Sequence, residues 1–293
     1  MATLDAHPWA GGVSLVSYGV RLGVRVDDAA LLEQLPLYLP PVRTRPATPG
    51  VDHLFSLCTT RRDGRRHERS VTRVYDGHRI VARRSALGPS MQLDLLRSCL
   101  EFHIASTARS WLFVHAGVVE WRGRAILIPG RSRSGKTTLV TALIRAGAGY
   151  YSDEFAVLDR FGRVHPWARP LRIRGPGRLP QSHPVETLGG LAGRRPLRVG
   201  LVVVTAYRAG ARWQPRALSP GQTLLALMGN TLLARSRPEL TLAILARAAR
   251  GARARKGWRD EAEALAATLL ADASVVTIDR NGHLRRPVEE EIV

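Results

Sequence analysis

Cysteine is nearly absent from this chain of 293 residues, which contains only Cys58 and Cys99. Their spacing matches no zinc-binding pattern, and two cysteines cannot build a disulfide framework. We therefore expect free thiols in a reducing compartment, and a cytoplasmic location.

Long apolar runs are lacking as well. The longest stretches, such as residues 199–206, are far too short to span a bilayer. Residues 1–10 show no basic segment followed by an apolar one, so we also expect no signal peptide. Both absences predict a protein without a membrane partner.

Acidic residues are few relative to basic ones, because 24 Asp and Glu oppose 44 Lys and Arg, for a formal net charge of +20. One interpretation is a polyanionic partner such as nucleic acid, an acidic peptide or a membrane surface. The other is an arginine-rich coding bias. Arginine is scattered along most of the chain rather than confined to one block, which favours the bias and leaves nucleic acid as a less favoured partner.

Lysine occurs only at positions 136 and 256. Lys136 belongs to the sequence Gly-Arg-Ser-Arg-Ser-Gly-Lys-Thr at residues 130–137, which we call the glycine loop and which fits the phosphate-binding pattern G-x-x-x-x-G-K-[ST]. An apolar run enters the loop at 125–129 and an amphipathic run leaves it, which is the strand–loop–helix context that the pattern requires. A glycine turn before an ordinary helix is the alternative interpretation.

The pattern binds phosphate because backbone N–H groups and the positive end of a helix surround the phosphate oxygens. Lys136 would reach the β- and γ-phosphates of a nucleotide, and the Thr137 hydroxyl would hold Mg²⁺. The residues expected to bind the nucleotide are Gly130, Arg131, Ser132, Arg133, Ser134, Gly135, Lys136, Thr137 and Thr138.

Asp153 and Glu154 follow the next expected strand, at 150–152. In a parallel sheet the end of that strand lies beside the glycine loop, where a carboxylate can hold Mg²⁺ or accept a hydroxyl proton. A pair of solvated loop acids is the alternative. His115 lies in an apolar strand that we expect to pair with the strand entering the loop, and by itself such a histidine is more often a core residue.

Strands alternate with helices after residue 88, which predicts an α/β domain at 89–293 behind a small strand-rich α+β lobe at 1–88. In the lobe we expect strands within 13–26, 51–60 and 71–84, a hairpin turn at Asp76-Gly77, and a helix capped by Asp27 that ends at 39. The domain should contain helices at 90–109, after the glycine loop, and at 220–235, 238–250 and 260–271. Its strands are expected at 111–121, 125–129, 150–152, 155–158, 163–167, 197–207 and 274–279, with a long surface segment at 169–196.

The run at 115–118, the segment at 123–128, the glycine loop and the acidic pair together resemble the C-terminal kinase domain of the HPr kinase/phosphorylase family. The likeness is greatest to the HPr kinase-related kinases, covers residues 111–167 and weakens toward residue 280. It implies a P-loop-containing HPr kinase-like core, a mixed sheet with flanking helices, that binds ATP with Mg²⁺. It also implies that Asp153 is the base toward a substrate hydroxyl, that His115 lies near the phosphates, and that a homo-oligomer is possible because related enzymes form hexamers.

The chain departs from that family in three places. Glu154 stands where the family has a second Asp, Thr138 where the true HPr enzymes have Glu, and Arg172 where a family signature has Glu. We therefore expect neither phosphorolysis nor HPr itself as the substrate.

The sequence thus predicts an ATP- and Mg²⁺-dependent kinase that transfers the γ-phosphoryl group to a hydroxyl, above all a serine, of a peptide, protein or small metabolite. Lys136 would hold the phosphates, and Thr137 would hold Mg²⁺ together with Glu154 or Asp153. Basic side chains from 169–195 would hold transferred charge or an acidic substrate.

Two alternatives remain open at this point. One is an ATPase or nucleotide-binding switch that acts with nucleic acid, which the basic run Arg247, Arg250, Arg253, Arg255 and Lys256 favours. Such a run also suits a solvated helix end. The other alternative is a non-catalytic scaffold that binds nucleotide.

Overall fold

The computed structural model describes residues 4–41, 50–60, 70–131, 134–173 and 181–274. The chain divides into two compact units, residues 1–109 and residues 110–293, and each is described by itself. The boundary therefore lies later than the one expected after residue 88, and the helix that follows residue 88 belongs to the first unit.

The N-terminal unit is built on a five-stranded sheet in the order β1-β2-β3-β4-β5. β2 and β3 run parallel, and every other neighbouring pair is antiparallel. The strands are β1 Gly11–Ser17, β2 Val20–Val26, β3 His53–Thr60, β4 Val71–Asp76 and β5 Arg79–Ser85, as the sequence predicts. Asp76 pairs with Arg79, so the hairpin turn is Gly77-His78 and lies one residue later than expected.

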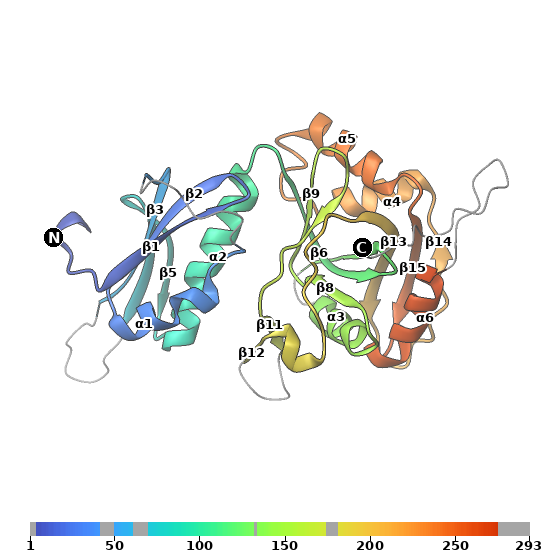
Figure 1. Ribbon diagram of the computed structural model, residues 1–293, viewed down its shortest axis with the longest axis horizontal. Coiled ribbons are helices and arrows are strands. Elements are labelled where there is room, and N and C mark those ends of the chain that lie inside the picture. Colours follow the sequence, from blue (N-terminus) through green and yellow to red (C-terminus); the bar gives the residue numbers. More distant parts are fainter. Residues whose placement is uncertain (1–3, 42–49, 61–69, 132–133, 174–180, 275–293) are drawn as a thin grey trace, which may run out of the picture. The chain divides into compact units, whose positions relative to one another are not determined.

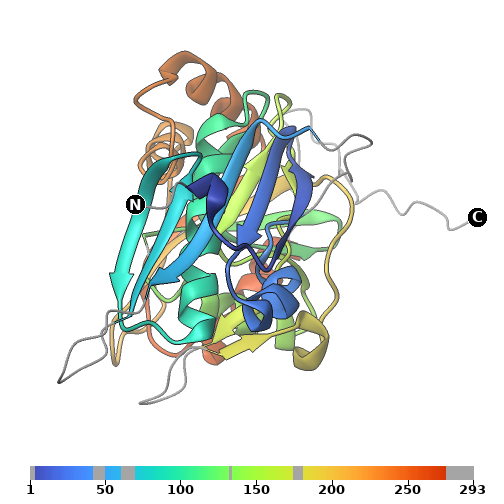
Figure 2. The same cartoon turned by 90° about the vertical axis from the view of Figure 1, so that its left-hand side faces the viewer.

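The helix α2 (Pro89–Thr107) packs against β3, β4 and β5. It lies along one face of the sheet in Figure 1, and Figure 2 shows the sheet from its other face. Its apolar stripe is at most 1% exposed and consists of Leu93, Leu96, Leu100 and Ile104. Because this stripe completes the core of the N-terminal unit, α2 folds with that unit and not with the residues after it.

The short helix α1 (Ala29–Gln34) begins after Asp28, whose Oδ1 accepts a hydrogen bond from the backbone N–H of Ala30. The sequence assigned this cap to Asp27. Asp27 Oδ2 instead accepts a hydrogen bond of 2.8 Å from the backbone N–H of Thr59 on β3. Two 3-10 helices complete the unit, η1 Leu4–Ala6 and η2 Leu35–Tyr38.

The C-terminal unit contains a mixed sheet in the order β10-β9-β6-β7-β13-β15-β14, with β8 paired to β6. β7, β13 and β15 run parallel, and the remaining pairs are antiparallel. The strands are β6 Leu112–Trp121, β7 Arg124–Pro129, β8 Gly149–Ser152, β9 Phe155–Leu158, β10 Val164–His165, β13 Arg198–Tyr207, β14 Arg216–Ala217 and β15 Arg253–Arg259. A separate two-stranded sheet, β11 Leu171–Ile173 and β12 Gln181–His183, precedes the 3-10 helix η3 Val185–Leu188.

Helices cover both faces of this mixed sheet (Figure 1). α3 (Lys136–Arg145) and α6 (Ala262–Ser274) share one core cluster with β7 and β13. α4 (Pro220–Met228) and α5 (Pro238–Ala249) contribute to the cluster on the opposite side of the same strands. The mixed α/β architecture expected from the sequence is thereby confirmed in this general form. Within the described ranges, no helix combines the length and apolar character needed to cross a membrane.

The helix expected at 220–235 ends at Met228, and three other segments of this unit also differ from the expectation. Residues 253–259 form β15 beside β13, where the sequence suggested a basic helix end, because their charges conceal the strand pattern. α6 extends to Ser274, so the strand expected at 274–279 does not begin there, and residues 275–279 lie outside the described part. The segment 169–196 is not wholly at the surface, since Leu171 and Val185 are buried in the cluster that contains α3.

Candidate functional site

The glycine loop connects the end of β7 to the start of α3, as expected from its flanking sequence. Gly135 precedes the helix with φ of 81°, in the left-handed region that favours glycine. The loop is fixed to β6, because the Gly130 N–H donates to the carbonyl of His115 at 3.2 Å. Ser132 and Arg133, two of the residues expected to bind nucleotide, lie outside the described residues.

Lys136 is the first residue of α3, and its side chain folds back over the loop. Its Nζ donates to the carbonyl oxygens of Gly130 at 2.8 Å and Arg131 at 2.9 Å. Burial lowers the pKa of Lys136, and the nearby carboxylates of Glu154 and Asp153 oppose that change. The ammonium group that the sequence assigned to the phosphates therefore lies inside the loop.

Asp153 and Glu154 occupy a bend between two strands that both pair with β6. β8 pairs with the second half of β6 and β9 with its first half, so the chain must turn between them. Ser152 Oγ stabilises the bend by accepting hydrogen bonds from the N–H groups of Glu154 and Phe155. The two acids are thereby held beside β6, next to the strand that enters the glycine loop.

Asp153 is 3% exposed and contacts the first turn of α3. Its Oδ2 accepts a hydrogen bond from Thr137 Oγ1 at 3.0 Å, and its Oδ1 accepts one from the Tyr150 hydroxyl at 3.1 Å. Burial, followed by the charge of Asp153, raises the pKa of Tyr150, so this hydroxyl remains a donor. The predicted metal-holding residues Thr137 and Asp153 are therefore in direct contact.

Glu154 forms a second pair with His115. His115 Nε2 lies 3.2 Å from Glu154 Oε1, and the Glu154 side chain is 33% exposed. Burial raises the pKa of Glu154, but the hydrogen bond from His115 and the charges of Arg169, His115 and Lys136 together lower it. The structure thus brings all three expected catalytic groups, His115, Lys136 and Asp153, into the same site as Glu154.

Arg169 joins the two carboxylates. Its Nη2 lies 3.1 Å from Glu154 Oε2, its Nε lies 3.5 Å from Asp153 Oδ1, and its side chain is only 8% exposed. The sequence indicated the basic segment that begins with this residue, but nothing in the sequence distinguished Arg169 from its neighbours.

Arg259, the last residue of β15, was not expected at the site. It is 3% exposed, and its Nη2 donates to the carbonyl of Gly135 at 2.9 Å. β13 lies between β15 and β7 and runs parallel to both. The carboxyl ends of these three strands therefore lie at the same edge of the sheet, where the glycine loop begins. Arg259 could not be predicted as a site residue, because β15 itself was not recognised in the sequence.

The residues present fit a magnesium ion and a phosphate chain. Ser134 Oγ is buried with no hydrogen-bond partner among the described residues, which leaves a polar group of the loop for an anion. A Cβ at Gly130 would lie 2.6 Å from that oxygen, so glycine keeps this space free. The hydroxyl and carboxylate oxygens of Thr137, Asp153 and Glu154 are the ligand type that Mg²⁺ prefers. Thr138, also assigned to the nucleotide, is exposed in the first turn of α3.

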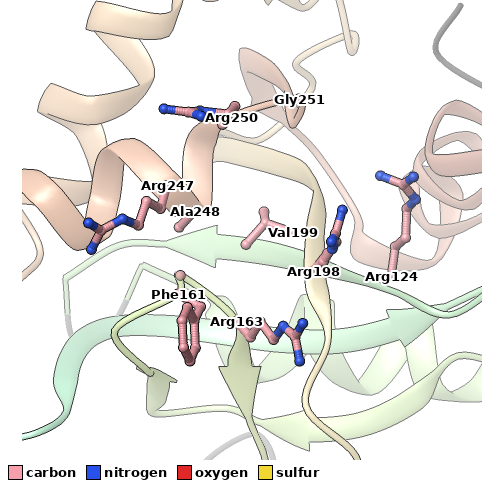
Figure 3. Close-up of a pocket in the computed structure, with 10 residues that line it drawn as sticks. Arg124, Phe161, Arg163, Arg198, Val199, Arg247, Ala248, Arg250 and Gly251 are labelled. Carbon is pink, nitrogen blue, oxygen red and sulfur yellow. The ribbon is translucent and has the colours of Figure 1, made fainter. Parts of the chain in front are cut away.

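A cavity of about 510 Å³ lies at the opposite ends of the parallel strands, away from the glycine loop. Figure 3 shows the arginines that line it, from the starts of β7 and β13, the turn before β10 and the end of α5; they are Arg124, Arg163, Arg198, Arg247 and Arg250. The first residues of the parallel strands β7 and β13 pair here, whereas the glycine loop follows the other end of β7. Cavity and loop are therefore separate sites.

The basic run considered in the sequence does not form one surface. Arg247 and Arg250 line the arginine cavity, but Arg253 and Arg255 lie 2.9 Å and 3.2 Å from the carboxylate oxygens of Asp272 on α6. Two of the five basic side chains thus share a single carboxylate within the unit.

No protein-family model matches this chain, and a comparison with curated proteins finds no match either. What the site can do is therefore inferred from its own side chains.

Proposed function

We propose that this chain is a kinase that transfers the γ-phosphoryl group of ATP, bound with Mg²⁺, to a hydroxyl group of a peptide, protein or small metabolite. The observation that carries the proposal is the contact of 3.0 Å between Thr137 Oγ1 and Asp153 Oδ2, next to the buried Lys136. Phosphoryl transfer requires positioning and charge neutralisation more than covalent chemistry, and these residues supply both. The resemblance of the same residues to HPr kinase-related kinases supports the same function.

Lys136 and the loop backbone would hold the phosphates. The ammonium of Lys136 already lies between the loop carbonyls of Gly130 and Arg131, so a small rotation of its side chain can exchange these bonds for phosphate oxygens. Arginine would not replace it, because a planar guanidinium needs more room than a site that leaves Lys136 only 6% exposed.

Thr137 and Asp153 would hold Mg²⁺, whereas Glu154, which the sequence also offered as a metal ligand, would serve the acceptor hydroxyl instead. When bound, the ion neutralises charge on the transferred group. Tyr150 and Arg169 fix the Asp153 carboxylate from the side away from Thr137, so its orientation does not depend on the ion.

The proton of the acceptor hydroxyl would pass to Glu154, supported by His115. In the transfer, the hydroxyl oxygen forms a bond to the γ-phosphorus while the bond from that phosphorus to the β–γ bridging oxygen breaks. The sequence gave the role of base to Asp153, but both oxygens of Asp153 already accept hydrogen bonds, and its side chain is 3% exposed. Glu154 is 33% exposed and lies 3.2 Å from an imidazole that can carry the proton away.

The test is incubation of the full chain with γ-labelled ATP, Mg²⁺ and a panel of serine-containing peptides and small alcohols, read by mass spectrometry. We expect a gain of one phosphate on an acceptor, and no gain with Lys136→Ala. Tight ATP binding without transfer to any acceptor would favour the scaffold alternative instead.

The second candidate, an ATPase that acts with nucleic acid, has one observation in its favour, which is the arginine cavity of Figure 3. It predicts salt-dependent retention on RNA or DNA that decreases in Arg198→Ala, together with ATPase stimulation by the nucleic acid. Retention without stimulation would reflect the net charge of +20 alone.

A further inference from the structure

Three side chains with metal-binding chemistry meet in the N-terminal unit, which the proposed function does not involve. They are His53 at the start of β3, Asp76 at the end of β4 and His103 on α2. One ligand atom from each lies within 4.8 Å of the other two. The antiparallel pairing of β3 with β4, in which Phe55 lies opposite Asp76, and the packing of α2 on these strands bring them together, although 23 residues separate His53 from Asp76 in the sequence.

The distances in this cluster are longer than those of ordinary hydrogen bonds. His53 Nδ1 lies 3.4 Å from Asp76 Oδ1, and His103 Nδ1 lies 3.5 Å from Asp76 Oδ2. Protein N–H···O bonds have donor–acceptor distances of about 2.7–3.2 Å. Zinc–ligand bonds of about 2.0–2.2 Å in a tetrahedral site place neighbouring ligand atoms roughly 3.3–3.5 Å apart. These distances are compatible with ligands around one ion, and what distinguishes the cluster is that ligand atoms of three residues, not two, lie within 4.8 Å of one another.

The two imidazoles face the same carboxylate from adjacent positions. Their ring centroids are 4.1 Å apart at an interplanar angle of 62°. His103 Nε2 is buried and has no hydrogen-bond partner within the described ranges, so no bond at that nitrogen fixes its ring. The ring is instead held by Phe55, whose centroid lies 5.1 Å away, with Nδ1 directed at Asp76.

Access from solvent suits an ion. The side chains of His53 and Asp76 are 39% and 25% exposed, so an ion can enter from solvent.

We propose that His53, Asp76 and His103 form a binding site for one divalent transition-metal ion of the zinc type. Two imidazoles and one carboxylate without a thiolate suit Zn²⁺ and its neighbours in the first transition row, rather than Mg²⁺ or Ca²⁺. Because the three ligands come from two strands and from α2, the ion ties the helix to the sheet.

The N-terminal unit offers a matched control. His7 Nε2 lies 3.4 Å from Asp27 Oδ2, the same kind of histidine–aspartate contact at the same distance, but without a second imidazole. A histidine–aspartate pair binds transition metals far more weakly than three ligands in one place. His7→Ala should therefore leave metal binding unchanged.

The experiment uses the full chain, freed of metal with a chelator and titrated with Zn²⁺ and Co²⁺ in the absence of nucleotide. We expect one equivalent of ion per chain, a tetrahedral Co²⁺ absorption spectrum, and a higher melting temperature with the ion. His53→Ala and Asp76→Asn should each weaken binding at least 10-fold and abolish the thermal shift, with an unchanged circular dichroism spectrum.

Equal binding by the wild type, His53→Ala and Asp76→Asn would overturn the proposal, as would no binding by a folded wild type. A loss in His7→Ala equal to that in His53→Ala would do the same. Since no nucleotide is present and none of these residues belongs to the glycine loop, the outcome is independent of the proposed kinase activity.

Discussion

Thr137 Oγ1 donates a hydrogen bond of 3.0 Å to Asp153 Oδ2, and this bond joins the first turn of α3 to the bend after β8. The two residues come from different elements, and Asp153 is held in addition by Tyr150 and Arg169. This hydroxyl and carboxylate, fixed beside the buried Lys136, are the proposed ligands of Mg²⁺.

Asp153→Asn should raise the Mg²⁺ concentration needed for half-maximal phosphoryl transfer and lower kcat by about 100-fold or more, because a metal ligand is lost. ATP binding in the absence of Mg²⁺ should change little, since the amide keeps the shape of the side chain. Initial rates over a range of Mg²⁺ concentrations, combined with calorimetric titration of ATP, measure both quantities.

Glu154→Gln should lower kcat by about 100-fold while leaving the Mg²⁺ requirement and the ATP affinity nearly unchanged, because the residue lost is the proton acceptor. His115→Gln should lower kcat less, since it acts through Glu154. The same measurements apply. The opposite result would contradict this assignment. If Asp153→Asn lowered only kcat and Glu154→Gln mainly raised the Mg²⁺ requirement, Asp153 would be the base.

Gly135→Ala should weaken MgATP binding by more than 10-fold. Its φ of 81° is unfavourable for alanine, and the new Cβ would collide with the Arg259 guanidinium, which bonds to the Gly135 carbonyl. Gly210→Ala is the matched control, because its φ of 72° imposes similar backbone strain but nothing lies within 4 Å of its Cβ. Gly210→Ala should lower the stability of the fold without lowering the affinity for MgATP. Equal losses of MgATP affinity in both variants would show that the contact of Arg259 with Gly135 does not matter for binding.

Stability should depend on pH through Glu154. The contacts of this carboxylate hold its folded pKa below the ordinary value of 4.5, so its ionised form stabilises the fold above pH 4.5. That contribution disappears as the pH falls from 4.5 through the lower folded pKa. In urea unfolding between pH 7 and pH 3, the difference in unfolding free energy between wild type and Glu154→Gln should therefore shrink as the pH falls. The exposed Glu186→Gln serves as the control, and a difference that stayed constant would contradict the assignment.

Much of this fold could be predicted where local patterns are strong. The strand–loop–helix at 125–145 follows from apolar periodicity and two glycines, and the helix at 89–107 follows from its leucine stripe. β15, which pairs with β13, could not be predicted, because its sequence shows no apolar alternation. Its residues Arg253 and Arg255 instead form ion pairs with Asp272 on α6. The sequence also could not show to which unit α2 belongs. Apolar periodicity identifies the buried face of a helix but not the sheet against which that face packs.

The candidate site was predictable to a similar degree. Lys136, Thr137, Asp153 and Glu154 were predicted from a local motif and the end of a neighbouring strand, and His115 only through the family resemblance. Arg169 and Arg259 were missed as individuals, because 44 basic residues in the sequence give no means of choosing two. The division of roles between Asp153 and Glu154 depends on side-chain contacts 3.0–3.2 Å long, which sequence spacing does not determine.

The central claim is that the phosphates of ATP bind at the glycine loop. Calorimetric titration of MgATP and of adenosine into wild type, Lys136→Ala and Lys256→Ala tests it most directly, because these variants remove the only two lysines of the chain one at a time. The account predicts that wild type and Lys256→Ala bind MgATP equally and adenosine much more weakly, and that Lys136→Ala binds MgATP roughly 10- to 100-fold more weakly through loss of a charge-assisted bond. Equal MgATP affinity in Lys136→Ala and Lys256→Ala, or equal affinity of the wild type for adenosine and MgATP, would contradict it.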